Sequence, residues 1–118
     1  MNLTAIDDAI LAHRTWISRF RASVSGISTE KFSVKAASDD TACSLGKWLL
    51  TEATEELPEL IYAQIVAQHK TFHHFAAEIV ELINRHESVT TINLYIEELD
   101  GLSKQLVTLL LSAKRRYQ

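Results

Sequence analysis

The sequence has little of what builds turns and covalent cross-links. It contains one cysteine, one proline and three glycines, and aromatic residues make up 8% of it. A single cysteine excludes an internal disulfide, so we expect a cytoplasmic chain whose thiol stays reduced. The scarcity of proline and glycine, beside a 47% share of hydrophobic residues, predicts helices and excludes a disordered chain.

The sequence also lacks an excess of either charge. Its 12 basic residues are interspersed with 15 acidic ones, and the formal net charge is −3. Because no segment carries a basic stripe, nucleic acid is not expected as a partner. The one basic cluster, residues 114–116, ends the last helical pattern, where it complements the negative end of a helix dipole.

No segment has the features of a secretory leader or a membrane span. The start, MNLTAIDDAILAH, has no basic region and carries Asp7 and Asp8, which is unlike a secretory signal. The longest apolar run, residues 106–111 around Thr108, is far shorter than the roughly 20 residues that cross a bilayer. We therefore expect no membrane partner.

Three long segments repeat apolar residues at steps of three and four, the pattern of one helix face. The first face reads Leu3, Ile6, Ile10, His13, Ile17, Phe20 and Val24. The second, opened by Leu57-Pro58, reads Ile61, Ile65, His69, Phe72, Ala76, Ile79 and Ile83. The third reads Ile92, Tyr95, Leu99, Leu102, Leu106, Leu109 and Ala113.

The chain between the first two long patterns is less regular. Gly26 is expected to end the first helix, and the periodicity fades from residue 27 to residue 40. A short helical pattern follows from about Asp40 to Ala53. Candidates for its N-cap are Ser38, Asp39, Asp40 and Thr41. We predict an all-α fold in one domain, 1–118: a four-helix antiparallel bundle with three long helices and one short helix that carries the cysteine.

His69 and His73 are four residues apart on a predicted helix, so their imidazoles project from one face and can bind one metal ion. The HxxxH pair alone is a weak signal, because neighbouring histidines also occur as core or surface residues. The intervening residues lack the glutamate of a metalloprotease helix. A zinc hydrolase is therefore disfavoured, and we do not expect an enzyme.

His13 and Cys43 are the other candidate ligands. His13 lies on an apolar face, where a buried imidazole needs a metal, a water or a carboxylate as partner, and spacing alone does not decide between them. Cys43 is expected in the first turn of the short helix, where the dipole favours the metal-binding thiolate; the alternative is a small buried hydrophobe. Three imidazoles and a thiolate would complete a tetrahedral zinc site without an open position. Gly46, one turn on, either permits a close backbone approach or is a weak point of the helix.

Three motifs carry a family resemblance. They are His13-Arg14-Thr15-Trp16 (HxxW), Cys43-Ser44-Leu45-Gly46-Lys47-Trp48 (CxLGxW) and His69-Lys70-Thr71-Phe72-His73 (HxxxH). In this order, and over nearly the whole chain, they resemble the chemoreceptor zinc-binding (CZB) domain of bacterial chemoreceptors and some diguanylate cyclases.

The resemblance implies one Zn²⁺ ion bound by His13, Cys43, His69 and His73, in a helical bundle that often pairs as a homodimer. It also implies a sensory and regulatory role in bacterial signal transduction. Zinc, or an oxidant such as hypochlorous acid acting on the ligand cysteine, would control chemotaxis or cyclic-di-GMP output. The sequence itself contains neither a chemoreceptor hairpin nor a cyclase, so the output would lie on a partner or in a longer protein.

Two other interpretations stay open. The first is a metal-independent helical dimerisation or interaction module, favoured by the surplus of apolar residues at Leu109, Leu110 and Leu111. The second is a hemerythrin-like iron protein, which is disfavoured because the predicted faces place no carboxylate beside the histidines.

Overall fold

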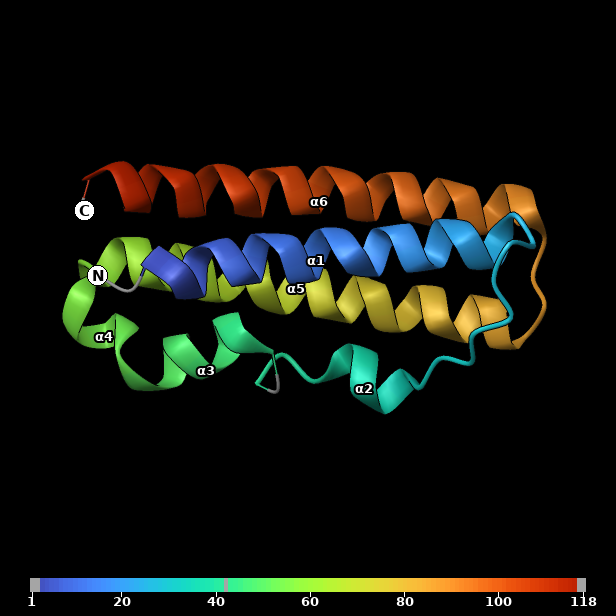
Figure 1. Cartoon of the computed structure of the whole chain (residues 1–118), viewed down its shortest axis with the longest axis horizontal. Helices are drawn as coiled ribbons and strands as arrows, with labels where there is room; N and C mark the ends of the chain where they lie inside the picture. The colour runs from blue at the N-terminus through green and yellow to red at the C-terminus, as the bar shows by residue number, and fades with distance from the viewer. Residues whose placement is uncertain (1–2, 42, 117–118) are drawn as a thin grey trace.

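The chain is all-helical, as predicted (Figure 1). The computed structural model describes residues 3–41 and 43–116, apart from the side chains of Leu3, Ala5 and Ser44. Six helices lie in this part of the chain: α1 (Leu3–Val24), α2 (Val34–Ser38), α3 (Ser44–Thr51), α4 (Ala53–Glu56), α5 (Glu59–Asn84) and α6 (Val89–Arg116). In the described residues no helix is long and apolar enough to cross a membrane.

The three long helices lie side by side, and the three short ones run along them (Figure 1). α1 and α5 run in the same direction, whereas α6 runs in the opposite one. α6 packs against both α1 and α5, α2 packs against α5, and α3 packs chiefly against α1. The result is an elongated molecule of 43 × 22 × 21 Å.

The region between α1 and α5 holds three short helices where the sequence predicted one. α2 lies in the segment where periodicity fades, and it begins because the Ser33 side chain accepts a hydrogen bond from the backbone N–H of Ala36. The predicted short helix, from about Asp40 to Ala53, corresponds to α3, and a further helix, α4, begins where the prediction ended. The predicted N-caps of this helix were wrong, because Cys43 itself caps α3.

Left-handed residues end two of the long helices. The predicted stop at Gly26 is confirmed: its φ is +83°, and the backbone N–H of Ile27 donates to the carbonyl of Ala22. His86 does the same after α5, with a φ of 57° and a bond from the N–H of Glu87 to the carbonyl of Leu82. Histidine is strained in this conformation, which glycine adopts freely.

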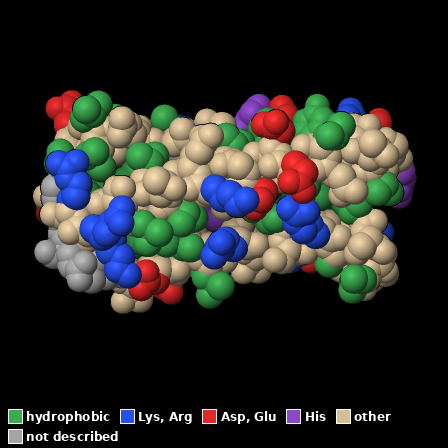
Figure 2. Space-filling model, turned by 90° about the horizontal axis from the view of Figure 1, so that it is seen from above, with side chains coloured by type: hydrophobic (Ala, Val, Ile, Leu, Met, Phe, Trp, Pro, Cys, Tyr) green, Lys and Arg blue, Asp and Glu red, His purple; other side chains and the backbone are tan. Residues whose placement is uncertain are grey.

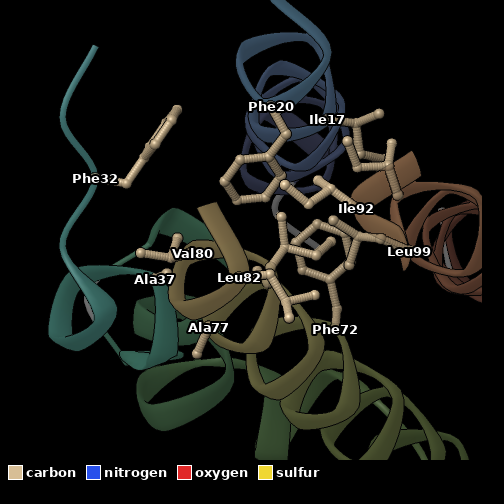
Figure 3. Packing of buried hydrophobic residues seen from close by; sticks show 13 residues of the cluster. Ile17, Phe20, Phe32, Ala37, Phe72, Ala77, Val80, Leu82, Ile92 and Leu99 are labelled. Carbon is tan, nitrogen blue, oxygen red and sulfur yellow. The ribbon is translucent and has the colours of Figure 1, made fainter. Parts of the chain in front are cut away.

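The buried apolar side chains form two clusters. The Phe20 cluster lies toward the α5–α6 turn and includes Ile17, Phe20, Phe32, Phe72 and Leu99 (Figure 3). The Leu45 cluster lies toward the chain termini and includes Ile6, Leu45, Trp48, Leu106 and Leu110. Cys43 packs against the edge of the Leu45 cluster.

The predicted buried face of α6 was only half right. Ile92, Leu99, Leu106 and Ala113 are buried, but Tyr95, Leu102 and Leu109 are half-buried. The fully covered positions in between are Ile96, Ser103 and Leu110. The face is displaced because α6 packs against two helices at once, so that a broader strip of its surface is covered.

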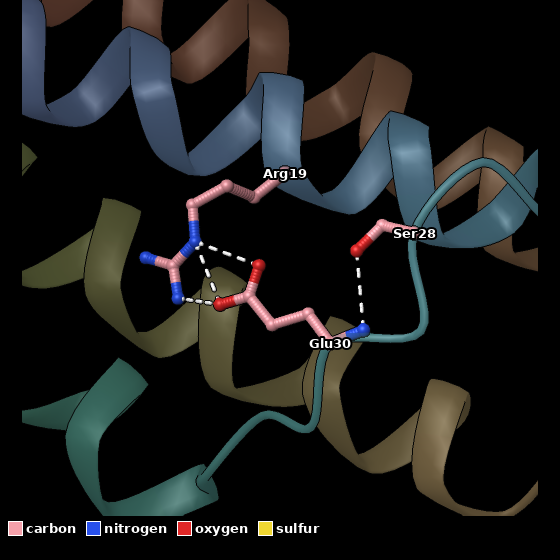
Figure 4. A network of polar contacts seen from close by, with 3 residues as sticks. All are labelled: Arg19, Ser28 and Glu30. Carbon is pink, nitrogen blue, oxygen red and sulfur yellow. Dashed lines mark hydrogen bonds and ion pairs between the residues drawn. The ribbon is translucent and has the colours of Figure 1, made fainter.

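Polar contacts hold the loop after α1 against that helix (Figure 4). The guanidinium of Arg19 forms an ion pair with the Glu30 carboxylate, with Nε 2.9 Å from Oε2, and lies 4.4 Å from the centre of the Trp16 ring. This guanidinium also holds the pKa of Glu30 below its usual value. The backbone N–H of Glu30 donates to the Ser28 hydroxyl. These contacts hold the loop that carries Phe32, a member of the Phe20 cluster.

The surface seen from the α6 side carries both charges (Figure 2). Basic and acidic side chains lie close to one another there, with apolar side chains between them. Ion pairs of α6 include Lys114 with Asp7 of α1 at 3.0 Å, Glu97 with Arg21 of α1 at 3.2 Å, and Lys104 with Asp100 one turn away at 3.2 Å. Exposed pairs of this kind contribute little to stability.

Candidate metal centre

The structure brings His13, Cys43, His69 and His73 into one group. Each offers a ligand atom, and these four atoms all lie within 4.8 Å of one another. The three histidines are almost completely buried, with exposed fractions of 1–2%, and Cys43 is partly buried. They come from three elements: His13 from the middle of α1, Cys43 from the start of α3, and the other two from α5.

The histidines form a polar layer between the two apolar clusters. On α1, His13 lies between Ala9 of the Leu45 cluster and Ile17 of the Phe20 cluster. On α5, His69 follows Ile65 of the Leu45 cluster by one turn. Buried polar groups must find partners, so this layer is energetically costly unless something satisfies its nitrogens.

Backbone carbonyls fix the proton on two of the imidazoles. Nδ1 of His13 lies 2.6 Å from the carbonyl oxygen of Ala9, and Nδ1 of His73 lies 2.9 Å from that of Ala37. A carbonyl oxygen only accepts hydrogen bonds, so in both residues Nδ1 carries the proton and Nε2 carries a lone pair. Partners of this kind orient metal-ligating histidines in proteins.

The two Nε2 atoms then face each other, 3.3 Å apart. Two lone pairs at this distance cannot form a hydrogen bond with each other, because neither nitrogen has a proton to donate. A cation between them satisfies both. This pair of nitrogens is the feature of the site that specifically calls for a metal ion.

Cys43 closes the remaining side of the group. Its Sγ lies 3.1 Å from Nε2 of His69 and 3.7 Å from Nε2 of His73. As the N-cap of α3, the same sulfur accepts a hydrogen bond from the backbone N–H of Gly46 at 3.4 Å. The start of α3 therefore fixes where the sulfur lies relative to the imidazoles.

Three of the six separations between the ligand atoms are close to those of tetrahedral zinc, and all six are within 4.8 Å. With Zn–N bonds of about 2.0–2.1 Å and a Zn–S bond of about 2.3 Å, a tetrahedron separates two nitrogens by about 3.3 Å and nitrogen from sulfur by about 3.6 Å. The observed separations are 3.3 Å for the nitrogen pair, and 3.1 and 3.7 Å from sulfur to nitrogen. Three imidazoles and a thiolate are also a donor set that zinc accepts.

Burial keeps the imidazoles neutral, as metal binding requires. It lowers the pKa of His13 from 6.5 to about 4 and that of His69 to about 3. Burial also lowers the pKa of His73. At neutral pH each ring therefore has a nitrogen lone pair available for a cation.

The start of α3 favours the Cys43 thiolate, as expected, but burial of the sulfur has the larger and opposite effect. Burial raises the pKa of the Cys43 thiol, and this effect exceeds the opposite effect of the backbone N–H groups of Gly46 and Leu45. Desolvation disfavours the charged form, and a single short helix does not compensate for it. The thiolate thus depends on a nearby cation.

Two other histidines lie away from the group. His74 is exposed and pairs with Glu78 one turn along α5, at 3.2 Å. His86 lies just beyond the end of α5. The Ala37 carbonyl could not be predicted, because a backbone group leaves no signature in the residue pattern. For Gly46 the sequence left open whether it permits a close backbone approach, and it did not indicate which backbone atoms lie against it.

Comparison with known proteins agrees with this geometry. The family model of the chemoreceptor zinc-binding domain matches residues 13–80. The matched range is more than half of the chain, and it contains all four residues of the group. Neither the curated proteins nor the solved structures include a significant match.

Proposed function

From its membership of the chemoreceptor zinc-binding domain family, to which this chain belongs, we propose that it is a sensory and regulatory module of bacterial signal transduction. In this proposal His13, Cys43, His69 and His73 bind one zinc ion. The proposal rests on one observation above all: the Nε2 atoms of His13 and His73, each with a lone pair, lie 3.3 Å apart in a buried layer.

Zinc in this site would act as a structural and regulatory ion. Four protein ligands leave it no open position for a substrate or a catalytic water, so we propose no enzymatic activity. Bound there, it would join α1, α3 and α5 at one point. Structural zinc binds zinc-finger peptides with a free energy of about 10–16 kcal/mol at neutral pH, which is comparable with the stability of a whole domain.

The chain's own residues suggest which part responds to the signal. His13 and His73 are held by backbone carbonyls, but Cys43 is carried by an eight-residue helix and has a raised thiol pKa. We propose that loss of the Cys43 bond, through zinc withdrawal or oxidation of the sulfur, releases α3. Short helices are marginally stable without tertiary contacts, so such a release would propagate along the segment.

The remaining parts of the proposal concern architecture and partners. Residues 1–118 would form one domain, a four-helix antiparallel bundle in which α2, α3 and α4 together take the place of one helix. The domain would work in the cytoplasm and pair as a homodimer. It would control chemotaxis or cyclic-di-GMP synthesis through a chemoreceptor or a diguanylate cyclase.

The donor set argues against one rival, and the burial of leucines on α6 argues against the other. A hemerythrin-like iron site needs carboxylates, but the group consists of three imidazoles and a thiol. The interpretation as a metal-independent module was favoured by three consecutive leucines. Of these, Leu110 is completely buried, Leu109 is half-buried and Leu111 is 40% exposed. Much of the supposed surplus is thus used inside the chain, although exposed Leu111 is compatible with a homodimer.

Elemental analysis of purified protein tests the ligand assignment. We expect about one zinc per chain in the wild type, and much less in Cys43→Ala and His73→Ala, because each variant removes one of four ligands. His74→Ala is the matched control, since it deletes an exposed histidine next to the site. Absence of zinc from the wild type after incubation with excess metal would refute the proposal. Equal zinc in all variants would refute the ligand set.

A further inference from the structure

Gly46 is in unusually close contact with the backbone before Cys43. A Cβ atom built at this position would lie 1.8 Å from the carbonyl oxygen of Asp40, 2.8 Å from its carbonyl carbon and 2.9 Å from Cα of Thr41. All three are backbone atoms, so no side-chain rotation can relieve the overlap. Any residue larger than glycine must displace this stretch of backbone.

Gly101 provides a contrast within the same chain. It also lies inside a helix, but a Cβ there would have no neighbour within 4 Å. The tight fit at Gly46 is therefore a property of its location and not of helical glycines in this protein.

The atoms around Gly46 also surround the sulfur of Cys43. The N–H of Gly46 donates to Sγ at 3.4 Å, and the thiol lies 3.7 Å from the same Asp40 carbonyl oxygen that faces Gly46. The carbonyl of Asp40 thus lies against both the glycine and the sulfur. Moving it away from position 46 necessarily changes the surroundings of the sulfur.

We propose that Gly46 is a positioning residue that sets the place of the Cys43 sulfur relative to the three imidazoles. The proposal rests on the four-residue zinc site proposed above. Its physical basis is that only glycine lets the Asp40 carbonyl lie against the start of α3. The imidazoles are carried by α1 and α5, so a side chain at position 46 displaces the sulfur and leaves the histidines in place.

Cobalt(II) substitution provides the test, because a thiolate bound to cobalt gives a charge-transfer absorption band that imidazole ligands do not give. The variants are Gly46→Ala, Gly101→Ala as the matched control, and Cys43→Ala as the reference for loss of sulfur. Affinity for cobalt(II) and zinc is measured by competition with a chromophoric chelator. We expect Gly46→Ala to bind about 10–100-fold more weakly, the usual effect of disturbing the supports of a metal ligand, with a weakened or absent thiolate band. Gly101→Ala should resemble the wild type.

A separate control experiment tests whether each variant folds. Far-ultraviolet circular dichroism establishes that each variant is helical, and the double variant Gly46→Ala/Gly101→Ala restores helix stability if the single variant is marginal. Wild-type affinity and a full thiolate band in folded Gly46→Ala would overturn the inference about Gly46 alone. So would a double variant that stays unfolded, since Gly46 would then be needed for the fold and not for the sulfur. Absence of the band from the wild type would overturn the proposed zinc site itself.

Discussion

The two apolar clusters on either side of the histidine layer are covered in different ways. The Phe20 cluster is covered by the loop after α1 and by α2, which are held by buried Phe32 and Ala37 and by the Arg19–Glu30 ion pair. The Leu45 cluster is covered by α3 and α4, two short helices that begin at Cys43. Their polar anchors are a bond from Trp48 to Glu56, within the same segment, and one from the Tyr62 hydroxyl to the Leu49 carbonyl.

If the proposed zinc site is correct, the difference indicates which half of the core depends on the metal. The cover of the Phe20 cluster includes no member of the metal-binding group, although the Ala37 carbonyl supports His73. The cover of the Leu45 cluster includes Cys43, whose sulfur would be bonded to the ion. One half of the core is therefore completed by packing alone, and in the proposed zinc site the other half would be completed by packing and a ligand bond.

Removal of zinc has the largest expected effect. It should lower the stability of the half that contains Cys43 more than that of the other half. Apparent stability should fall by several kcal/mol, since structural zinc contributes up to about 10–16 kcal/mol in small domains. Hydrogen exchange measured with and without chelator should accelerate most in residues 44–56 and much less in residues 34–38. Equal acceleration in both segments would contradict the comparison.

Paired core substitutions should sharpen the contrast. Phe20→Ala should cost about 3–5 kcal/mol with or without zinc, because its cluster is completed by packing in both states. Leu45→Ala should cost about 2–5 kcal/mol in the zinc-loaded protein, and markedly less after chelation, when α3 is already loosened. Denaturant unfolding of both variants in both states measures this. A cost for Leu45→Ala that does not depend on zinc would show that α3 stays packed without the ion.

Acid should weaken the metal-free protein at the histidine layer. The pKa of His13 falls from 6.5 in the unfolded chain to about 4 in the folded one, so between these values only the unfolded chain takes up the proton. Stability is thus retained above pH 6.5 and is lost as the pH falls toward 4, by about 3 kcal/mol from His13 alone. Chelated wild type and His13→Phe, unfolded by denaturant from pH 7 to pH 4, provide the comparison. The variant should lose less stability than the wild type over this range.

The smallest effect is expected from a substitution that lies in neither apolar cluster. Gly101→Ala should stabilise α6 by about 1 kcal/mol, because alanine is the better helix former and its methyl group meets nothing. The gain should be equal with and without zinc, as judged by thermal unfolding in the two states. A gain confined to the zinc-loaded protein would mean that α6 also depends on the ion.

The sequence was sufficient to place the long helices and to select the four residues that the structure brings together. His13, His69 and His73 are polar residues at apolar positions of helix faces, and this conflict with burial is visible in the pattern itself. The end of α1 was predictable as well, because Gly26 supplies the left-handed conformation that a helix stop needs.

Other features depend on contacts that the sequence pattern does not contain. Cys43 was expected in the first turn of a helix that begins near Asp40, but it is the N-cap, because α3 begins only at Ser44. The direction of its pKa shift depends on burial by the surrounding elements. The covered face of α6, with Ser103 completely enclosed, follows from contact with two helices at once.

The sequence separation of the metal-binding residues has a consequence for the order of folding. His13 and His73 are 60 residues apart, and Cys43 and His69 are 26 apart. Bringing such distant residues together costs chain entropy, and contacts of this range form late in a search governed by topology. An ion that binds two or three of these residues in the unfolded chain would close these loops early. On a ribosome the site can be completed only after residue 73 has emerged, so α1 is made well before the helix that supplies the last ligand.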